Sequence, residues 1–334
     1  MREYRLNDFR GIDSLTLTET PIPIQGPSEV LVKIHAVSLQ HRDLIVAKGA
    51  YPKPLKPGVV PVSDMAGEIV AIGNDVTNFS VGERVCANFA MPGFTFGDLG
   101  AKIDGVLTEY KVFPADPERI VKFPEHLTYR EAATLPCAGL TAYAALFGPV
   151  PVKRGDTVLI QGTSGVSILA LQFAHAVGAI AIITSSSEDK LKTAQTLGAR
   201  HCINYSTTPK WDEEVLKITK GKGADIVIDI GGASTLLQSI NACAFGGWVK
   251  LVGTIDATDL NSLPLQTIFK NACLQGVVMG GVERFIEMNK VIEEVKLRPY
   301  IDPKQFSFEE AVEAFRYMNS HSHVGKVVIQ VSRD

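Results

Sequence analysis

One uninterrupted run, residues 158–174, constrains this chain of 334 residues more than any other stretch. The strand-like residues VLIQ lead into the small-residue turn GTSGVS and directly into the helical pattern ILALQFA. Such a turn suits a nucleotide pyrophosphate, because the helix N-terminus offers unpaired N–H groups and a positive dipole end. Gly162 permits the sharp turn, and Gly165 lets the backbone approach the phosphates. The predicted phosphate contacts are Gly162, Thr163, Ser164, Gly165 and Val166.

The turn is an incomplete version of the G-x-G-x-x-G fingerprint, because Ser167 stands where the third glycine is usual. Taken alone, it fits a plain strand-to-helix connection as well as a nucleotide site. Its context favours the nucleotide site, because strand and helix patterns alternate from Thr157 to Glu294. This alternation, with several almost wholly apolar strands, predicts an α/β fold with a doubly wound, Rossmann-type parallel sheet.

The first 125 residues have a different character. Short alternating strand patterns are separated by loops rich in proline and glycine, which predicts a mostly antiparallel β domain. The tail from residue 295 holds one helical and one strand pattern, and we expect it to fold back onto this domain. The predicted domains are therefore 1–125 together with 295–334, and 126–294 for the dinucleotide.

Composition excludes several classes of protein. The formal net charge is -3 and there is no long basic run, which argues against nucleic acid or an anionic membrane as the main partner. No secretory signal and no membrane-spanning apolar stretch are evident. The cysteines form no close pair, so we expect reduced thiols in a cytoplasmic protein rather than disulfides or a structural zinc. They are Cys86, Cys137, Cys202, Cys243 and Cys273.

The tip of the second strand in the alternating region indicates which nicotinamide cofactor binds. NAD-binding folds carry an Asp or Glu about 20 residues after the glycine turn, and it binds the ribose 2′-OH. Here the strand ends in three serines and has no acid at its tip. Ser185, Ser186 and Lys190 would hold a 2′-phosphate by charge-assisted hydrogen bonds, and Tyr205 can add a phenolic donor. We therefore predict NADP(H); a capping serine beside a solvated lysine is the alternative.

Four motifs carry a resemblance to a known family. They are GVVPVSDMAGEIV at 58–70, GERV at 82–85, LPCAGLTAY at 135–143 and HVGKVV at 323–328. With the domain order, they resemble the medium-chain dehydrogenase/reductase superfamily over nearly the whole chain. The likeness is closest to the zinc-independent branch of quinone oxidoreductases and zinc-type alcohol dehydrogenase-like proteins. It implies a GroES-like β domain beside the Rossmann domain, a small-molecule substrate, and a homodimer formed through the last Rossmann strand, Leu274–Met279.

The resemblance also bears on zinc. In zinc members, a Cys–His pair of the first domain and a Cys of the second hold the catalytic metal. Gln40 occupies the first Cys position and Ser63 the His position, so only Cys137 matches a ligand. Amide and hydroxyl groups are poor zinc ligands, although Asp64 keeps the acidic position beside the lost histidine. The expected reaction is hydride transfer without a metal.

Without a metal, hydrogen-bond donors must stabilise the oxyanion that forms on the substrate. Quinone oxidoreductases carry Asn and Tyr in this part of the cleft, and Gln40 and Tyr51 match these positions. The resemblance thus assigns Gln40 as a donor to a substrate carbonyl and Tyr51 as a hydrogen-bond or proton donor. The alternatives are that Gln40 caps a helix and that Tyr51 packs within its proline-rich loop.

The resemblance implies further contacts. Those expected to line the substrate cleft are Ser63, Asp64, Cys137, Phe94 and Phe96. Those added to the cofactor contacts are Thr141, Gly253 and Lys326. Phe94 and Phe96 would cover the site or pack against a partner subunit. A helix-surface hydroxyl is the alternative for Thr141, and a solvated lysine is the alternative for Lys326.

Three functions fit these observations. The first is hydride transfer between NADPH and a carbonyl or alcohol. The second is NADPH-dependent reduction of an activated C=C bond in an enone or a quinone. The third, of another class, is NADPH binding without turnover, as in a sensor or an abundant structural protein.

Overall fold

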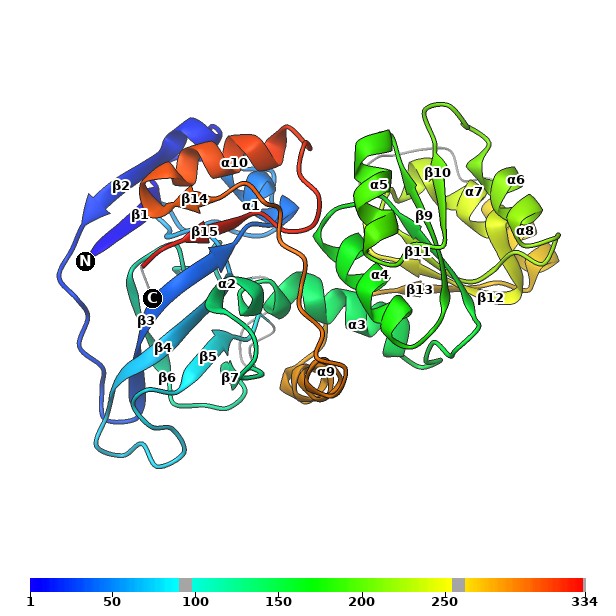
Figure 1. The fold of residues 1–334 in the computed structure, drawn as a ribbon. Helices are drawn as coiled ribbons and strands as arrows, with labels where there is room; N and C mark the ends of the chain where they lie inside the picture. The colour runs from blue at the N-terminus through cyan, green and yellow to red at the C-terminus, as the bar shows by residue number, and fades with distance from the viewer. Residues whose placement is uncertain (90–97, 254–261, 333–334) are drawn as a thin grey trace. The chain divides into compact units, whose positions relative to one another are not determined.

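The computed structural model describes residues 1–89, 98–253 and 262–332. The chain forms two compact units, Met1–Leu140 with Gly280–Asp334, and Thr141–Met279. Figure 1 shows a β-rich unit and an α/β unit. These junctions differ from the predicted ones, because residues 126–140 and 280–294 group with the β unit. Pattern alone does not show which unit a helix packs against.

The α/β unit has a six-stranded parallel sheet in the order β10-β9-β8-β11-β12-β13. Its strands are β8 (Thr157–Gln161), β9 (Ile180–Ser185), β10 (His201–Asn204), β11 (Ala224–Asp229), β12 (Cys243–Leu251) and β13 (Cys273–Gly276). The predicted Rossmann-type sheet is confirmed, and the last strand ends at Gly276 rather than Met279.

Helices precede or connect these strands (Figure 1). They are α3 (Leu140–Phe147), α4 (Gly165–Ala176), α5 (Glu188–Thr196), α6 (Trp211–Ile218), α7 (Ala233–Ala242) and α8 (Leu263–Lys270). The alternation of strands and helices expected from Thr157 onward is confirmed. Helix α8 was not predicted. It is short, and a proline stands in its first turn.

The β unit contains a larger sheet in the order β14-β15-β3-β4-β5-β7, with β6 paired to β3. Its strands are β3 (Glu29–Ser38), β4 (Asp64–Ile72), β5 (Arg84–Ala87), β6 (Tyr110–Pro114), β7 (Ile120–Lys122), β14 (Phe306–Ser307) and β15 (Val328–Gln330). All pairs are antiparallel except β14 with β15. Strands β1 (Arg2–Leu6) and β2 (Leu15–Glu19) form a separate hairpin. The mostly antiparallel, GroES-like domain is thereby confirmed.

Short helices complete the β unit. They are η1 (Ile12–Ser14), α1 (His41–Ala47), α2 (Tyr129–Ala132), the π-helical η2 (Leu135–Gly139), α9 (Val282–Glu294), η3 (Phe308–Glu310) and α10 (Ala311–Asn319). The tail returns to this unit as expected, because β15 pairs with β3. Within the described part of the chain, no helix is long and apolar enough to cross a membrane.

The register of β3 brings distant parts of the sequence together. Ser38, the last residue of β3, lies opposite both Asp64 of β4 and Val328 of β15. The residues that follow β3, precede β4 and precede β15 therefore meet at one corner of the sheet. Gln40, Ser63 and Lys326 occupy these three positions.

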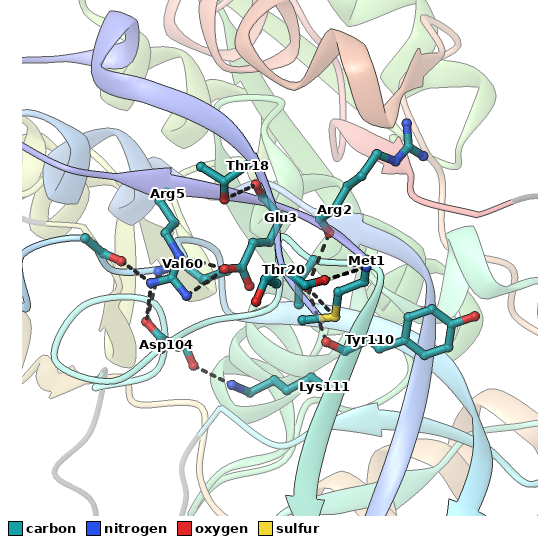
Figure 2. A network of polar contacts seen from close by, with 12 residues as sticks. Met1, Arg2, Glu3, Arg5, Thr18, Thr20, Val60, Asp104, Tyr110 and Lys111 are labelled. Atoms are coloured by element: carbon teal, nitrogen blue, oxygen red, sulfur yellow. Dashed lines mark hydrogen bonds and ion pairs between the residues drawn. The ribbon is translucent and has the colours of Figure 1, made fainter. Parts of the chain in front are cut away.

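A polar network fixes the segment that leads to this corner (Figure 2). The guanidinium of Arg5 donates to the Gly58 carbonyl at 2.6 Å. The Asp104 carboxylate accepts the Val60 N–H at 3.1 Å, and Lys111 Nζ donates to the Asp104 carbonyl at 2.8 Å. These bonds attach residues 58–60 to β1 and to the loop before β6, and so fix the approach to Ser63.

Candidate active site

The predicted phosphate turn forms as expected between β8 and α4. Gly162 has φ 69°, in the left-handed region that favours glycine, and α4 begins at Gly165. Ser167, which replaces the third glycine, is fully buried, and its Oγ donates to the Gln161 carbonyl at 2.7 Å. The serine therefore closes the turn onto the strand. The first N–H groups of α4 have no partner within the helix and are available to an anion.

The residues predicted to select the cofactor gather around the tip of β9. Ser185 is buried, and its carbonyl accepts the Tyr205 N–H at 3.0 Å. Tyr205 itself is 42% exposed. Ser187 caps α5 by accepting the Lys190 N–H at 3.5 Å, which places Lys190 in the first turn of that helix. Residues with hydroxyl, phenol and ammonium side chains thus meet at one tip through their backbones, with exposed Ser186 between the strand and the cap.

The first acid after β9 is directed toward the neighbouring strand. Glu188 opens α5, and its Oε1 accepts a hydrogen bond from Asn204 Nδ2 at 2.6 Å. This side chain is therefore engaged with β10.

The remaining cofactor candidates divide between the two units. Thr141 is buried near the start of α3 in the α/β unit. Gly253 follows β12, and its N–H donates to the Asp229 carbonyl at 3.3 Å. Lys326 belongs to the β unit, is only 4% exposed, and donates from Nζ to the Leu39 carbonyl. It is therefore not the solvated lysine of the alternative interpretation.

Two residues that the sequence analysis missed lie at the carboxyl edge of the parallel sheet. Gln161 and Asp229 are the last residues of β8 and β11, and both side chains are buried. Gln161 Nε2 lies 3.3 Å from Asp229 Oδ2. A polar residue that ends an otherwise apolar strand was the available signal.

In the β unit, four predicted site residues form a series of hydrogen bonds. Gln40 precedes α1 as its N-cap, and its Nε2 donates to Ser63 Oγ at 3.0 Å. Ser63 Oγ donates to Asp64 Oδ1 at 3.2 Å. Asp64 Oδ2 accepts the Cys137 N–H at 3.3 Å. The structure thus unites the substrate-cleft candidates Ser63, Asp64 and Cys137 with the catalytic candidate Gln40.

Two local features hold these hydrogen-bonded residues in place. The Gln40 N–H donates to Asp43 Oδ2 at 2.8 Å, so Asp43 anchors the start of α1. Val62, next to Ser63, has φ 71°, which is unusual for a β-branched residue. Its carbonyl accepts the Val106 N–H at 2.9 Å, which locks the turn before Ser63.

Burial controls protonation in this cluster. Asp64 is fully buried, which raises the pKa of its carboxyl to about 7. Lys326 opposes this rise, nearby Asp43 adds to it, and the Ser63 hydrogen bond lowers the pKa again. Burial first, and Asp64 second, raise the pKa of the Cys137 thiol far above its usual range. Cys137 is therefore a neutral thiol, and Asp64 changes charge near neutral pH.

Tyr51 lies beside the start of α1. Its half-buried ring stacks on the Arg42 guanidinium, with 4.8 Å from the guanidinium carbon to the ring centre. Arg42 Nη2 donates in turn to the Leu99 carbonyl at 2.7 Å. Tyr51 is thus attached to the helix that Gln40 begins. Phe94 and Phe96 lie outside the described residues.

A separate apolar groove of about 700 Å³ lies between β7 and α9 in the β unit. Its lining includes Phe79, Val121, Phe123 and Ile286. It contains none of the predicted site residues, so we do not place the chemistry there.

Comparison with protein families matches two parts of the chain. Residues 26–125 match the alcohol dehydrogenase GroES-like domain, and residues 165–294 match the family described as zinc-binding dehydrogenase. The zinc-type alcohol dehydrogenase-like protein C1773.06c of Schizosaccharomyces pombe is 42% identical, over 97% of both chains. The chain belongs to the medium-chain dehydrogenase/reductase superfamily. It is therefore an oxidoreductase, and the family resemblance found in the sequence is confirmed.

Other members of the superfamily are similar along most of their length. Human quinone oxidoreductase is 31% identical over 84% of this chain and 80% of its own. A putative alcohol dehydrogenase from Sinorhizobium meliloti 1021 has a TM-score of 0.90 at 35% identity, covering 99% of this chain and 98% of its own. An NAD-dependent alcohol dehydrogenase has a TM-score of 0.90 at 32% identity, covering 99% and 100%. The mycobacterial protein Rv1454c, complexed with NADPH, has a TM-score of 0.82 at 26% identity, covering 99% and 100%.

In the present protein, the polar cluster of Gln40, Ser63, Asp64 and Cys137 does not suit zinc. Catalytic zinc needs deprotonated thiolate, imidazole or carboxylate ligands in a tetrahedral arrangement. Here Gln40 presents its NH₂ group to Ser63, and the Ser63 hydroxyl is already engaged with Asp64. Among the described residues, no group of three or more His, Cys, Asp or Glu side chains is placed to hold a metal ion. These groups therefore do not make a catalytic zinc site.

Proposed function

We propose that this protein is a zinc-independent, NADPH-dependent oxidoreductase that transfers hydride between the cofactor and a small carbonyl or alcohol. The observation that carries the proposal is the chain of hydrogen bonds from Gln40 through Ser63 to Asp64. In this proposal, amide, hydroxyl and carboxyl groups stand at the positions that the resemblance assigns to the metal site of zinc members. Such groups can bind and polarise a carbonyl oxygen by hydrogen bonding.

Three residues of the β unit have distinct roles in this proposal. Gln40 has two amide hydrogens, one of which is given to Ser63, so the other can bind the substrate oxygen. Ser63 holds that amide in orientation. Tyr51, fixed on Arg42, supplies the hydrogen bond or the proton for the oxygen. When bound, NADPH supplies the hydride from C4 of its nicotinamide.

The choice of NADPH rests on the β9 tip. Ser185, Ser186, Lys190 and Tyr205 offer donors to a 2′-phosphate, whereas an acid there would repel it. The relatives include one protein named as NAD-dependent and one complexed with NADPH. Because similarity alone does not distinguish the two cofactors, the proposal of NADPH rests on the tip residues. NADPH should give a higher kcat/KM than NADH with the same substrate; the reverse order would contradict the proposal.

A second candidate function is reduction of an activated C=C bond or a quinone. Similarity to human quinone oxidoreductase favours it. The same donors would then bind the carbonyl oxygen while hydride reaches the β-carbon. NADPH oxidation against matched panels of aldehydes, enones and quinones separates the two reactions. Binding without turnover on any panel would leave only a non-catalytic NADPH-binding protein.

Variants at Tyr51 test the proton donor. Tyr51→Phe keeps the ring that stacks on Arg42 and removes only the hydroxyl. The expected result is a loss of kcat of about 10²-fold with little change in melting temperature. Tyr110→Phe, in β6, is the matched control and should keep wild-type kcat. An unchanged kcat for Tyr51→Phe would show that Tyr51 is not the acid.

We also propose a homodimer that forms through β13 in a reducing, cytoplasmic setting. Strand β13 is the edge of the described parallel sheet, and neighbouring α8 exposes the side chains of Leu265, Ile268 and Phe269. Exposed strand edges and apolar patches favour association. Light scattering should give twice the chain mass for the wild type and a monomer for Phe269→Glu. A monomeric wild type would refute the dimer.

A further inference from the structure

The buried side chain of Gln161 connects two turns of the parallel sheet. Its Oε1 accepts the backbone N–H groups of Ile230 at 3.0 Å and Gly231 at 3.2 Å. Its Nε2 donates to Ser239 Oγ at 2.7 Å and lies 3.3 Å from Asp229 Oδ2. One amide from the end of β8 thus holds the start of the turn between β11 and α7.

The carboxylate of Asp229 organises the other side of that turn. It is fully buried, and its Oδ1 accepts the Gly232 N–H at 2.7 Å. Ser239 Oγ donates to Oδ2 at 2.6 Å, and Thr235 Oγ1 lies 3.0 Å from both oxygens. A buried carboxylate with this many donors is well satisfied, and removing one donor leaves a costly unpaired group. The network therefore stabilises the observed arrangement of the turn.

The position of this network in the sheet gives it a functional meaning. The strand order reverses between β8 and β11, and in such sheets ligands bind in the crevice outside this point. Gln161 directly precedes Gly162 of the phosphate turn, and its carbonyl accepts the Ser167 hydroxyl. The same residue therefore fixes the phosphate turn through its main chain and the facing turn, residues 230–232, through its side chain.

We propose that Gln161 and Asp229 are positioning residues that hold the two walls of the cofactor crevice at a fixed separation. The diphosphate and nicotinamide half of the cofactor then enters a crevice that needs no rearrangement, which preserves binding energy. The adenosine half lies at the β9 tip and does not depend on the network. This inference rests on the proposed use of NADPH and adds the residues that shape its site.

The test compares two ligands on the full-length protein. Gln161→Glu keeps the acceptor for the turn but replaces the donor toward Asp229 with a second carboxyl oxygen. The Kd of NADPH should rise about tenfold or more, whereas the Kd of adenosine 2′,5′-bisphosphate should stay within about twofold of the wild-type value. General loss of folding would weaken both ligands together, so the split identifies positioning.

Strand β11 offers a matched control at its opposite end. Asp225 Oδ2 accepts the Thr157 N–H of β8 at 2.8 Å, so it also joins β11 to β8, but at the edge remote from the crevice. Asp225→Asn should leave the Kd of NADPH unchanged. Equal weakening by Asp225→Asn and Gln161→Glu would overturn the proposal, and so would wild-type NADPH affinity in Gln161→Glu.

A milder variant keeps the proposal testable if Gln161→Glu does not fold. Ser239→Ala removes one donor to Asp229 from α7 and substitutes no residue of either turn. It should raise the Kd of NADPH several-fold and leave adenosine 2′,5′-bisphosphate unaffected; unchanged NADPH affinity would overturn the proposal. If the wild type prefers NADH, the NADPH assignment fails, and the same comparison with NADH and adenosine monophosphate decides the positioning role.

Discussion

The phosphate turn of the α/β unit and the polar cluster of the β unit are built in opposite ways. The turn is one continuous stretch, 158–174, in which strand, glycine turn and helix follow from local preferences. The cluster joins Gln40, Ser63, Cys137 and Lys326, which meet only because β3 pairs with both β4 and β15. The proposed cofactor-binding turn is thus encoded locally, whereas the proposed reacting groups depend on sheet register. Cofactor affinity should therefore be sensitive to backbone changes in the turn, and turnover should be sensitive to the loss of single side-chain groups in the polar cluster.

The largest effect should follow from a backbone change in the turn. Gly162→Val places a β-branched residue at φ 69°, which costs about 1–2 kcal/mol and shifts the phosphate-binding N–H groups. We expect kcat/KM for NADPH to fall by at least about 10²-fold. Steady-state kinetics and NADPH titration measure this.

Gly155 provides the control for that strain. It has φ 87° in the exposed loop before β8, away from the turn. Gly155→Val should lose similar stability and keep the wild-type KM for NADPH. If both variants lose cofactor affinity equally, the locally encoded turn is not what binds the phosphates.

The next effect tests the cluster. Gln40→Leu preserves side-chain size and deletes the amide that bonds to Ser63. The expected result is a fall in kcat of about 10²-fold, with the Kd of NADPH unchanged, because a transition-state donor is lost. The neighbouring exposed residue supplies the control, His41→Ala, which should remain near wild type. Loss of NADPH binding in Gln40→Leu would contradict the separation of the two regions.

Asp64 should make the stability of the cluster depend on pH. The pKa of its carboxyl is about 7 when folded and about 3.9 in an unfolded chain, so the folded state binds more protons between these values. Unfolding free energy therefore falls as pH rises from about 4 to about 7, by up to about 1.4 kcal/mol per pKa unit.

Asp64→Asn should remove that slope. Its stability relative to wild type should increase from pH 5 to pH 8, as measured by denaturant unfolding. Asp75→Asn, which alters an exposed carboxyl, should show no such trend. Parallel curves for wild type and Asp64→Asn would show that Asp64 titrates normally.

The smallest expected effect concerns cofactor choice. Lys190→Ala removes an ammonium from the β9 tip, and its charge-assisted bond to a 2′-phosphate is worth about 1.5–3 kcal/mol. The ratio of kcat/KM for NADPH over NADH should fall by about tenfold, with NADH kinetics unchanged. Lys192→Ala, whose ammonium pairs with Asp189, is the control. An unchanged ratio would remove Lys190 from the proposed 2′-phosphate site.

The same contrast explains how much the sequence could predict. The strands of the parallel sheet and the turn at Gly162 were predictable because period and glycine position are local signals. The pairing of Gln161 with Asp229 was not, because it joins strands 68 residues apart that neighbour only in the folded sheet. Gln40 and Ser63 were singled out by resemblance, and only the β3–β4 register explains their contact. The unit junctions differed because the sequence does not show where α9 packs.

The Lys326 bond to the Leu39 carbonyl has a consequence for the newly made chain. The ammonium beside Asp64 and the strand that pairs with β3 both come from residues 326–330, which follow the whole α/β unit along the chain. During synthesis, the α/β unit can fold while these residues are still inside the ribosome. The polar cluster cannot form until residues 326–330 emerge, so a chain truncated before Lys326 would keep the turn at Gly162 and lack both the Lys326 contact and strand β15.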